Sequence, residues 1–216
     1  MNTGQTNNNR SMNSTPDSNA PTAPVITIMD NVGIVQGPVP DGGITDDSTP
    51  TIIGAGDNAG NQVIITDTDG TIIASATVRA NGTWTATPRT PLIDGEHTLS
   101  VTVTDASGDS SPPTEVTVTV DTTAPAVPVI TAVTDDSGSV TGDMSGGTVT
   151  DDSMPTMAGT AEADSVVHVY DNGTEIGTAK VDAQGNWTFT PDKSLPEGVH
   201  HLTAVAEDAA GNQSPA

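Results

Sequence analysis

The sequence contains no cysteine and very few aromatic or basic residues. Its 216 residues include two Trp, one Tyr and one Phe, and only five Lys or Arg against 28 Asp or Glu. Without cysteine, no disulfide can stabilise the fold. The formal net charge of −23 leaves no Lys and Arg clusters for binding phosphates, which excludes nucleic acid as a partner. A bare anionic membrane surface would repel the chain for the same reason.

Long apolar runs are also missing. No run approaches the roughly 20 apolar residues that a membrane-spanning helix needs, so no membrane insertion is expected. Residues 1–22 lack the apolar segment of a signal peptide. Their polar composition predicts a disordered leader or linker, so any secretion signal would lie outside this sequence.

What the chain has in quantity is Thr, Val, Ile, Gly and Pro. β-branched residues pack well on pleated surfaces, which favours strands. The 22 Gly and 16 Pro interrupt the chain at short intervals and leave no room for a long helix. The composition therefore predicts an all-β fold.

Several sequence blocks occur twice in the same order. The block NGTWTATP at Asn81 recurs as QGNWTFTP at Gln184, and DGEHTLSVTVTD at Asp94 recurs as EGVHHLTAVAED at Glu197. Both pairs are separated by 103 residues. Such constant spacing indicates two homologous domains, which we place at residues 23–123 and 124–216.

The pattern within one copy indicates an immunoglobulin-like β-sandwich. In EHTLSVTVTD, apolar and polar residues alternate, as expected for a half-buried antiparallel strand. About seven strands separated by turn residues fit this class of sandwich. In the first copy we predict strands at 24–29, 50–54, 62–66, 71–79, 83–87, 97–104 and 115–121.

The second copy stops early. Its last residues align with Ser111–Pro113, so the strand TEVTVTVDTT that closes the first copy has no counterpart. We therefore expect a second sandwich without its last strand, and a chain that is a fragment of a longer repeat array.

Trp84 and Trp187 occupy the same position in the two copies. The favoured interpretation is a core tryptophan in each sandwich, and the alternative is a ring that stacks on a sugar.

The blocks VDTTAPAVPVI, TDDSMPTMAGTAEA, YDNGTEIGTAKVDAQGNWTFTP and AEDAAGNQSP resemble the bacterial Ig-like repeats of large surface adhesins and biofilm-associated proteins. This resemblance covers residues 23–216. It implies a long extracellular rod of tandem domains, type I secretion, and calcium ions at or near the domain junctions.

Acidic residues recur at matching places, such as TDDSTP at Thr45 and TDDSMP at Thr150. Because alternate loops of a sandwich lie at opposite ends, these acidic residues should gather at three ends of the two sandwiches. Calcium prefers such oxygen ligands, whereas the plain alternative is a set of solvated loops. The candidate Ca²⁺ ligands are Asp30, Asn31, Asp46, Asp47 and Asp121 at the exit end of domain 1, Glu162, Asp164, Asp208 and Asn212 at the entry end of domain 2, and Asp135, Asp136, Asp151 and Asp152 at the exit end of domain 2.

A similar acidic stretch, DTDG at Asp67, is not part of this set. It begins like an EF-hand loop but lacks the later glycine and glutamate, and is predicted to be a hairpin turn.

No catalytic constellation is evident, so we expect a protein that is not an enzyme. Too few aromatic residues are present to build a sugar-cleaving cleft around paired carboxylates. We predict a Ca²⁺-rigidified stalk segment of a bacterial surface adhesin, monomeric, extracellular, and in contact with neighbouring Ig-like repeats. Other parts of the parent protein would then reach the host or biofilm surface. The alternatives are a carbohydrate- or protein-binding module, with DNVGIVQGPVPDGG at Asp30 as the candidate loop, or an accessory domain of a secreted hydrolase.

Overall fold

All regular elements in the described part of the chain are β-strands. The computed structural model describes residues 20–55 and 57–216, so the predicted disordered leader, residues 1–22, lies almost entirely outside the described residues. Within those residues no helix is long and apolar enough to cross a membrane. The all-β prediction is confirmed.

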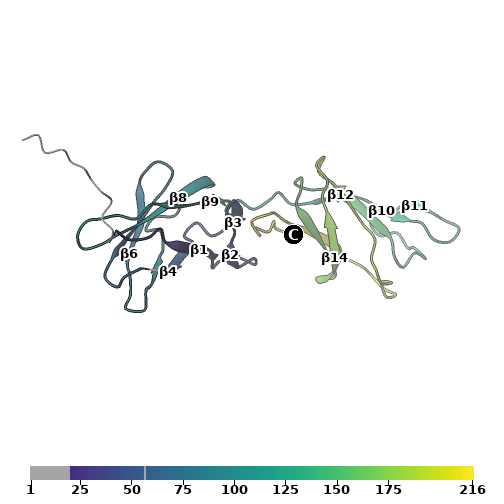
Figure 1. Cartoon of the computed structure of the whole chain (residues 1–216). Coiled ribbons are helices and arrows are strands. Elements are labelled where there is room, and N and C mark those ends of the chain that lie inside the picture. Colours follow the sequence, from purple (N-terminus) through teal and green to yellow (C-terminus); the bar gives the residue numbers. More distant parts are fainter. Residues whose placement is uncertain (1–19, 56) are drawn as a thin grey trace, which may run out of the picture.

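Domain 1 is a sandwich of two sheets (Figure 1). One sheet has the strand order β2-β1-β4-β7 and the other β3-β9-β8-β5-β6. The strands are β1 (Val25–Asp30), β2 (Gly37–Val39), β3 (Gly43–Thr45), β4 (Thr51–Ala55), β5 (Gln62–Thr66), β6 (Ile72–Thr77), β7 (Thr83–Ala86), β8 (Gly95–Thr104) and β9 (Thr114–Val120).

Domain 2 repeats this plan with fewer strands. Its sheets have the orders β11-β10-β12-β15 and β14-β13-β16. As predicted, the second sheet has no counterpart of β9 in the described residues. The strands are β10 (Val129–Asp135), β11 (Gly142–Asp143), β12 (Thr156–Thr160), β13 (Val166–Asp171), β14 (Thr174–Lys180), β15 (Asn186–Phe189) and β16 (Leu202–Glu207).

All seven strands predicted in the first copy are present with small shifts at their ends. The structure adds two three-residue strands, β2 and β3, that the sequence pattern did not reveal. β2 pairs with β1, and β3 runs parallel to β9. The residues 67–71 form the β5–β6 hairpin turn as predicted, with Gly70 at a φ of +81°.

Each sandwich has a tryptophan at its centre. Trp84 and Trp187 are only 1% and 2% exposed, so the sugar-stacking alternative is wrong. Each indole lies against a glycine of the neighbouring strand: Gly54 pairs with Trp84 and Gly159 with Trp187. A Cβ at Gly54 would lie 2.2 Å from Cζ2 of Trp84, so the indole occupies the space of a missing side chain.

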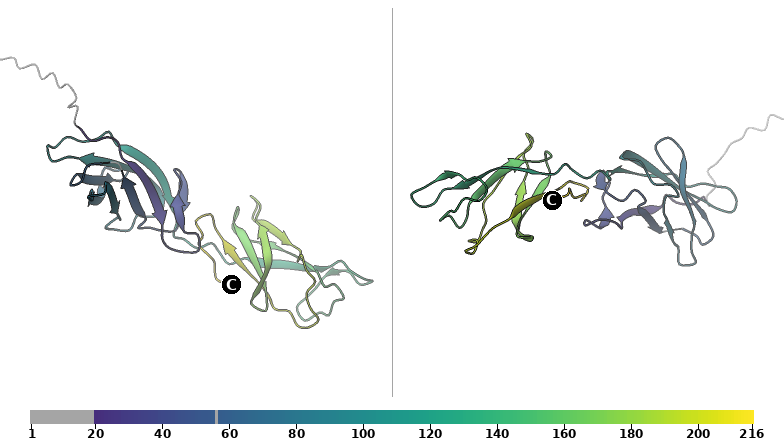
Figure 2. Two further views of the ribbon diagram at one scale, coloured as in Figure 1. Left: turned by 60° about the horizontal axis from the view of Figure 1, so that its bottom comes forward. Right: turned by 180° about the vertical axis from the view of Figure 1, so that it is seen from behind.

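The two sandwiches lie end to end and give the molecule an elongated shape (Figures 1 and 2). The link between β9 and β10 runs from the exit end of domain 1 to the entry end of domain 2. The loop after β16 and the C-terminus lie beside this link, at the junction of the domains (Figure 1). This arrangement brings the exit end of domain 1 next to the entry end of domain 2.

Candidate functional site at the domain junction

The exit end of domain 1 holds two buried carboxylates that organise the loops around them. Asp30, the last residue of β1, accepts hydrogen bonds from the backbone N–H of Val32 and from the hydroxyl of Thr45. Asp47 accepts backbone N–H bonds from Asn31 at 3.1 Å and from Thr49 at 2.8 Å. These contacts give both carboxylates a structural role in shaping the loops.

Asp46, which directly precedes Asp47, has a different environment. Its carboxylate folds over Gly33, which has a φ of +61°, and a Cβ on that glycine would lie only 2.0 Å from Oδ2 of Asp46. Its Oδ1 is buried and has no hydrogen-bond partner among the described atoms. Burial raises the pKa of Asp46, and the neighbouring carboxylates of Asp30 and then Asp47 raise it further. A cation would relieve both effects.

Domain 2 has the same arrangement at its own exit end. Asp152 accepts backbone N–H bonds from Asp136 at 3.2 Å and Met154 at 2.8 Å. Asp135 accepts bonds from the backbone of Ser137 and the hydroxyl of Thr150. Asp151 folds over Gly138 as Asp46 folds over Gly33.

The entry end of domain 2 contributes a tight loop, Asp208–Asn212, after β16. Asp208 accepts backbone N–H bonds from Ala210 at 2.8 Å and Asn212 at 2.9 Å. The side-chain amide of Asn212 donates to Asp208 and, at 2.8 Å, to the backbone carbonyl of Asp121 in domain 1. The second bond is a direct link between the two domains.

The remaining predicted ligands are used differently. The carboxylate of Asp121 accepts a bond from the backbone N–H of Thr123, and the side-chain amide of Asn31 donates to Met29 and Thr51. Glu162 and Asp164 are exposed in the loop after β12. Among residues 20–55 and 57–216, no three acidic or histidine side chains converge closely enough to hold a metal ion. The prediction of individual calcium ligands therefore stays a prediction.

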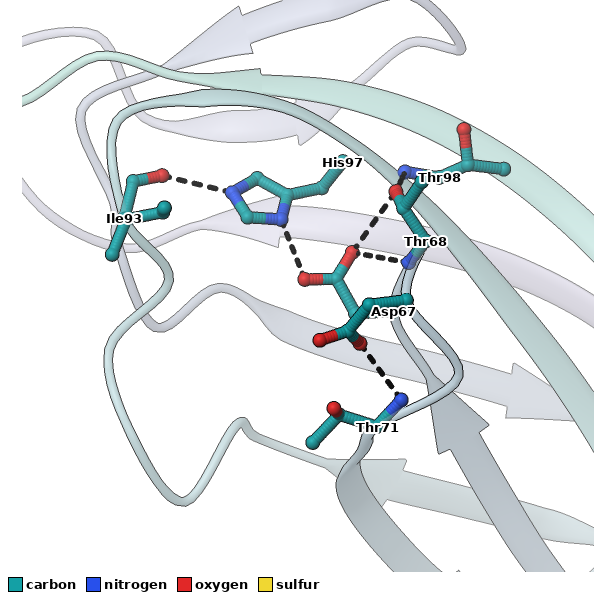
Figure 3. A network of polar contacts seen from close by, with 7 residues as sticks. Asp67, Thr68, Thr71, Ile93, His97 and Thr98 are labelled. Atoms are coloured by element: carbon teal, nitrogen blue, oxygen red, sulfur yellow. Dashed lines mark hydrogen bonds and ion pairs between the residues drawn. The ribbon is translucent and has the colours of Figure 1, made fainter.

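One polar pair, missed in the sequence, recurs in both domains; Figure 3 shows the pair of domain 1. His97 Nδ1 lies 2.7 Å from Oδ2 of Asp67, and its Nε2 lies 2.8 Å from the carbonyl of Ile93. His200 makes the same contacts, at 2.7 Å to Asp171 and 2.8 Å to the carbonyl of Pro196. The recurrence of Asp67 as Asp171 and of His97 as His200, at matching places in the two copies, was the signal that could have revealed the pair.

Both ring nitrogens face acceptors, which favours the doubly protonated imidazolium. For His97, burial lowers the pKa but is outweighed by the carbonyl of Ile93 and by Asp67, so the pKa is raised. For His200, the hydrogen bond to Asp171 is the main cause of a raised pKa. A histidine–aspartate pair is two-thirds of a catalytic triad, but here Nε2 is held by a carbonyl and not by a nucleophile. The pair instead fastens the loop before β8 to the β5–β6 turn, near the place where many Ig sandwiches use a tyrosine.

The fold and its repeated site define two tandem immunoglobulin-like sandwiches. The family described as Bacterial Ig-like domain matches residues 24–122 and again residues 124–216. The chain therefore belongs to the bacterial Ig-like domain family.

Three solved structures illustrate what the chain is similar to. A biofilm-associated protein matches at 23% identity over 80% of this chain, with a TM-score of 0.30, and this chain spans only 27% of its length. A Ca²⁺-stabilised adhesin that helps an Antarctic bacterium bind ice matches at 20% identity over 90% of this chain and 47% of its own, with a TM-score of 0.36. The fibronectin(III)-like modules of Clostridium thermocellum CbhA match at 19% identity over 88% of this chain and 90% of theirs, with a TM-score of 0.49. No curated protein sequence matches the chain.

Proposed function

We propose that this chain is a non-catalytic stalk segment of a bacterial cell-surface adhesin. The observation that carries the proposal is the end-to-end placement of two sandwiches of one family, with a direct hydrogen bond across the junction. Such a unit extends a chain outward, and further copies would lengthen it in proportion. In this role the segment holds the adhesive parts of a parent protein away from the cell, in support of adhesion or biofilm formation.

We further propose that Ca²⁺ binds at the exit end of domain 1 and stiffens the junction. The support is Asp46, whose buried Oδ1 has no partner among the described atoms and whose pKa is raised by burial and by Asp30. Asp30 and Asp46 would hold the ion with backbone carbonyls and water, and the ion would neutralise the repulsion between them. Extracellular modules bind calcium at about 10⁻⁴–10⁻³ M, so such a site would fill outside the cell.

Small-angle X-ray scattering tests the stalk, and thermal unfolding in calcium or EDTA tests the ion. We expect an elongated particle in both solutions, and a higher melting temperature in calcium. A particle in which the domains fold back on each other would overturn the stalk. Identical melting curves in about 1 mM calcium and in EDTA would contradict the calcium proposal but would not affect the stalk proposal.

The variant Asp46→Asn separates the repulsion between carboxylates from the binding of calcium. In EDTA the variant should melt slightly higher than the natural protein, because it removes a buried charge beside Asp30. In calcium it should lose most of the increase in melting temperature. The matched variant Asp151→Asn changes the corresponding residue of domain 2 and should leave the calcium response of domain 1 unchanged.

A further inference from the structure

The loop Asp208–Asn212 of domain 2 contacts domain 1 through Gly211 and Asn212. Ala210 is only 2% exposed, and Gly211 is buried as well. Val35, from the loop between β1 and β2, is the neighbour that covers Gly211: a Cβ on this glycine would lie 3.1 Å from Cγ2 of Val35. Together with the bond from Asn212 to the carbonyl of Asp121, this contact seats one domain on the other.

The corresponding loop of domain 1, Asp105–Asp109, shows what the loop looks like when it is not covered. Asp105 accepts backbone bonds from Ser107 and Asp109, as Asp208 does from its own loop. Gly108 has a φ of +93° and Gly211 one of +95°, so the two loops have the same conformation at this point. Gly108, however, is exposed, and a Cβ there would meet nothing within 4 Å.

The part of domain 1 that contacts this loop, around Val35, has a counterpart in domain 2. Val140 in domain 2 stands five residues after Asp135, as Val35 stands five residues after Asp30. The flanking register is the same, because Asp30 pairs with Gly37 and Asp135 with Gly142. Val140 is 79% exposed, against 53% for Val35 at the junction.

We propose that the exit end of domain 2, around Val140, is a docking surface for the Asp-x-x-Gly-Asn loop of a following Ig-like domain. The junction within this chain is the template: a valine fits against a glycine, and an asparagine amide donates to the carbonyl at the end of the last strand. The proposal rests on the stalk function and names the partner of this surface.

Two chemical requirements make this docking selective. Glycine favours docking because a Cβ at its place would lie 3.1 Å from Cγ2 of the valine, whose side chain would have to shift by a few tenths of an ångström. The asparagine is required because a carboxylate cannot donate a hydrogen bond to a carbonyl. Domain 1 has Asp109 where domain 2 has Asn212, so a second copy of this chain would not dock through its own domain 1.

The existing junction tests the template, with Gly211→Ala against Gly108→Ala. Both substitutions strain the backbone equally, but only the first meets Val35. Spin labels on one engineered cysteine in each domain report the interdomain distance, and the absence of native cysteine keeps the labelling clean. We expect a broadened distance distribution for Gly211→Ala and an unchanged one for Gly108→Ala. Equal distributions for the two variants would overturn the proposal.

A second pair avoids backbone strain altogether. Val35→Ser should also broaden the distribution between domains 1 and 2, whereas Val140→Ser should not. If Val35→Ser leaves the distribution as narrow as that of the natural protein, the valine does not seat the loop and the proposal fails.

An extended chain then tests the docking surface itself. Repeating residues 114–216 after Ala216 supplies a last strand, a linker and a third domain with its own Asp-x-x-Gly-Asn loop. Val140→Ser should broaden the distances between the second and third domains only, and so should Asp in place of the new loop's asparagine. If neither change alters the distances between the second and third domains, the proposal is overturned. An elongated particle formed by the first two domains would still support the stalk function.

Discussion

The two domains share a sequence pattern but not the same secondary structure, and the difference lies around β9. In domain 1, β8 extends over Gly95–Thr104, whereas in domain 2 its counterpart β16 covers only Leu202–Glu207. Residues 198–201 match the first part of β8 in sequence but form no strand. In domain 1 this part of β8 pairs with β9, and domain 2 has no such partner in its described residues. Strand formation here depends on a partner far away in the chain as much as on the local sequence.

The same difference explains the short strand β3. It exists in domain 1 because it pairs in parallel with β9, and the corresponding residues 148–150 form no strand. Side chains beneath the missing strand are also less covered. Leu99 is fully buried and Leu202 only partly, and the side chain of His97 is 8% exposed against 23% for His200.

The largest effect should come from making domain 1 resemble domain 2. Val118→Pro removes a ladder hydrogen bond from the middle of β9 and disturbs a fully buried side chain. Losing the buried valine costs about 1.5–3 kcal/mol and each ladder bond about 0.5–1.5 kcal/mol. Hydrogen exchange should then show faster exchange at residues 95–98 of β8. Val149→Pro, at a 96% exposed position, is the control, and unchanged protection of β8 in Val118→Pro would contradict the dependence on β9.

A smaller effect on stability should distinguish the hydrophobic cores of the two domains. Leu99→Ala should lower the free energy of unfolding of domain 1 by about 2–5 kcal/mol, because a fully buried side chain leaves a cavity. Leu202→Ala should cost domain 2 clearly less, since that side chain is already partly exposed. Denaturant unfolding followed by NMR signals from each domain measures both values. Equal losses would mean that the missing strand does not weaken the packing around Leu202.

The smallest effect is a pH dependence shared by both domains. The pKa values of His97 and His200 are raised in the folded state, chiefly by their carboxylate and carbonyl partners. Their contribution to stability is therefore fully present below the unfolded-state value of about 6.5 and is lost as the pH rises through the folded-state pKa. His97→Gln should flatten the fall in stability of domain 1 above pH 6.5, and His200→Gln that of domain 2.

Unfolding free energies measured at several pH values above and below 6.5 check this prediction. His201→Gln, at an exposed position, is the control for a histidine outside the pairs. A stability of domain 1 that rises with pH over this range in the natural protein would show that the ring is not held as a cation.

The strands and the core could be predicted from the sequence because their signal is local. Alternation in β8 and the matched Trp84 and Trp187 are visible in any single copy or in the comparison of the two. Topology alone also placed Asp46 near Asp121, and the structure agrees, since the backbone N–H of Asp121 donates to the carbonyl of Thr45.

Contacts between distant residues could not be predicted in this way. Nothing local indicates that the hydroxyl of Thr45 donates to Asp30 or that the backbone N–H of Asn31 donates to Asp47. The same is true of the contact between His97 and Asp67, which are thirty residues apart. The β3–β9 pair is hidden for the same reason: β3 is three residues long, and only its parallel partner makes it a strand.

That parallel pair has a mechanical consequence for domain 1. β3 belongs to the first part of the domain and β9 is its last strand. In the proposed stalk, tension along the chain would therefore pull the two strands in opposite directions along their length. The hydrogen bonds between Gly43–Thr45 and Val118–Val120 would then be loaded together in shear, and not opened one after another. Three residues that the sequence pattern hides would thus form a latch that lets the domain carry force without unravelling.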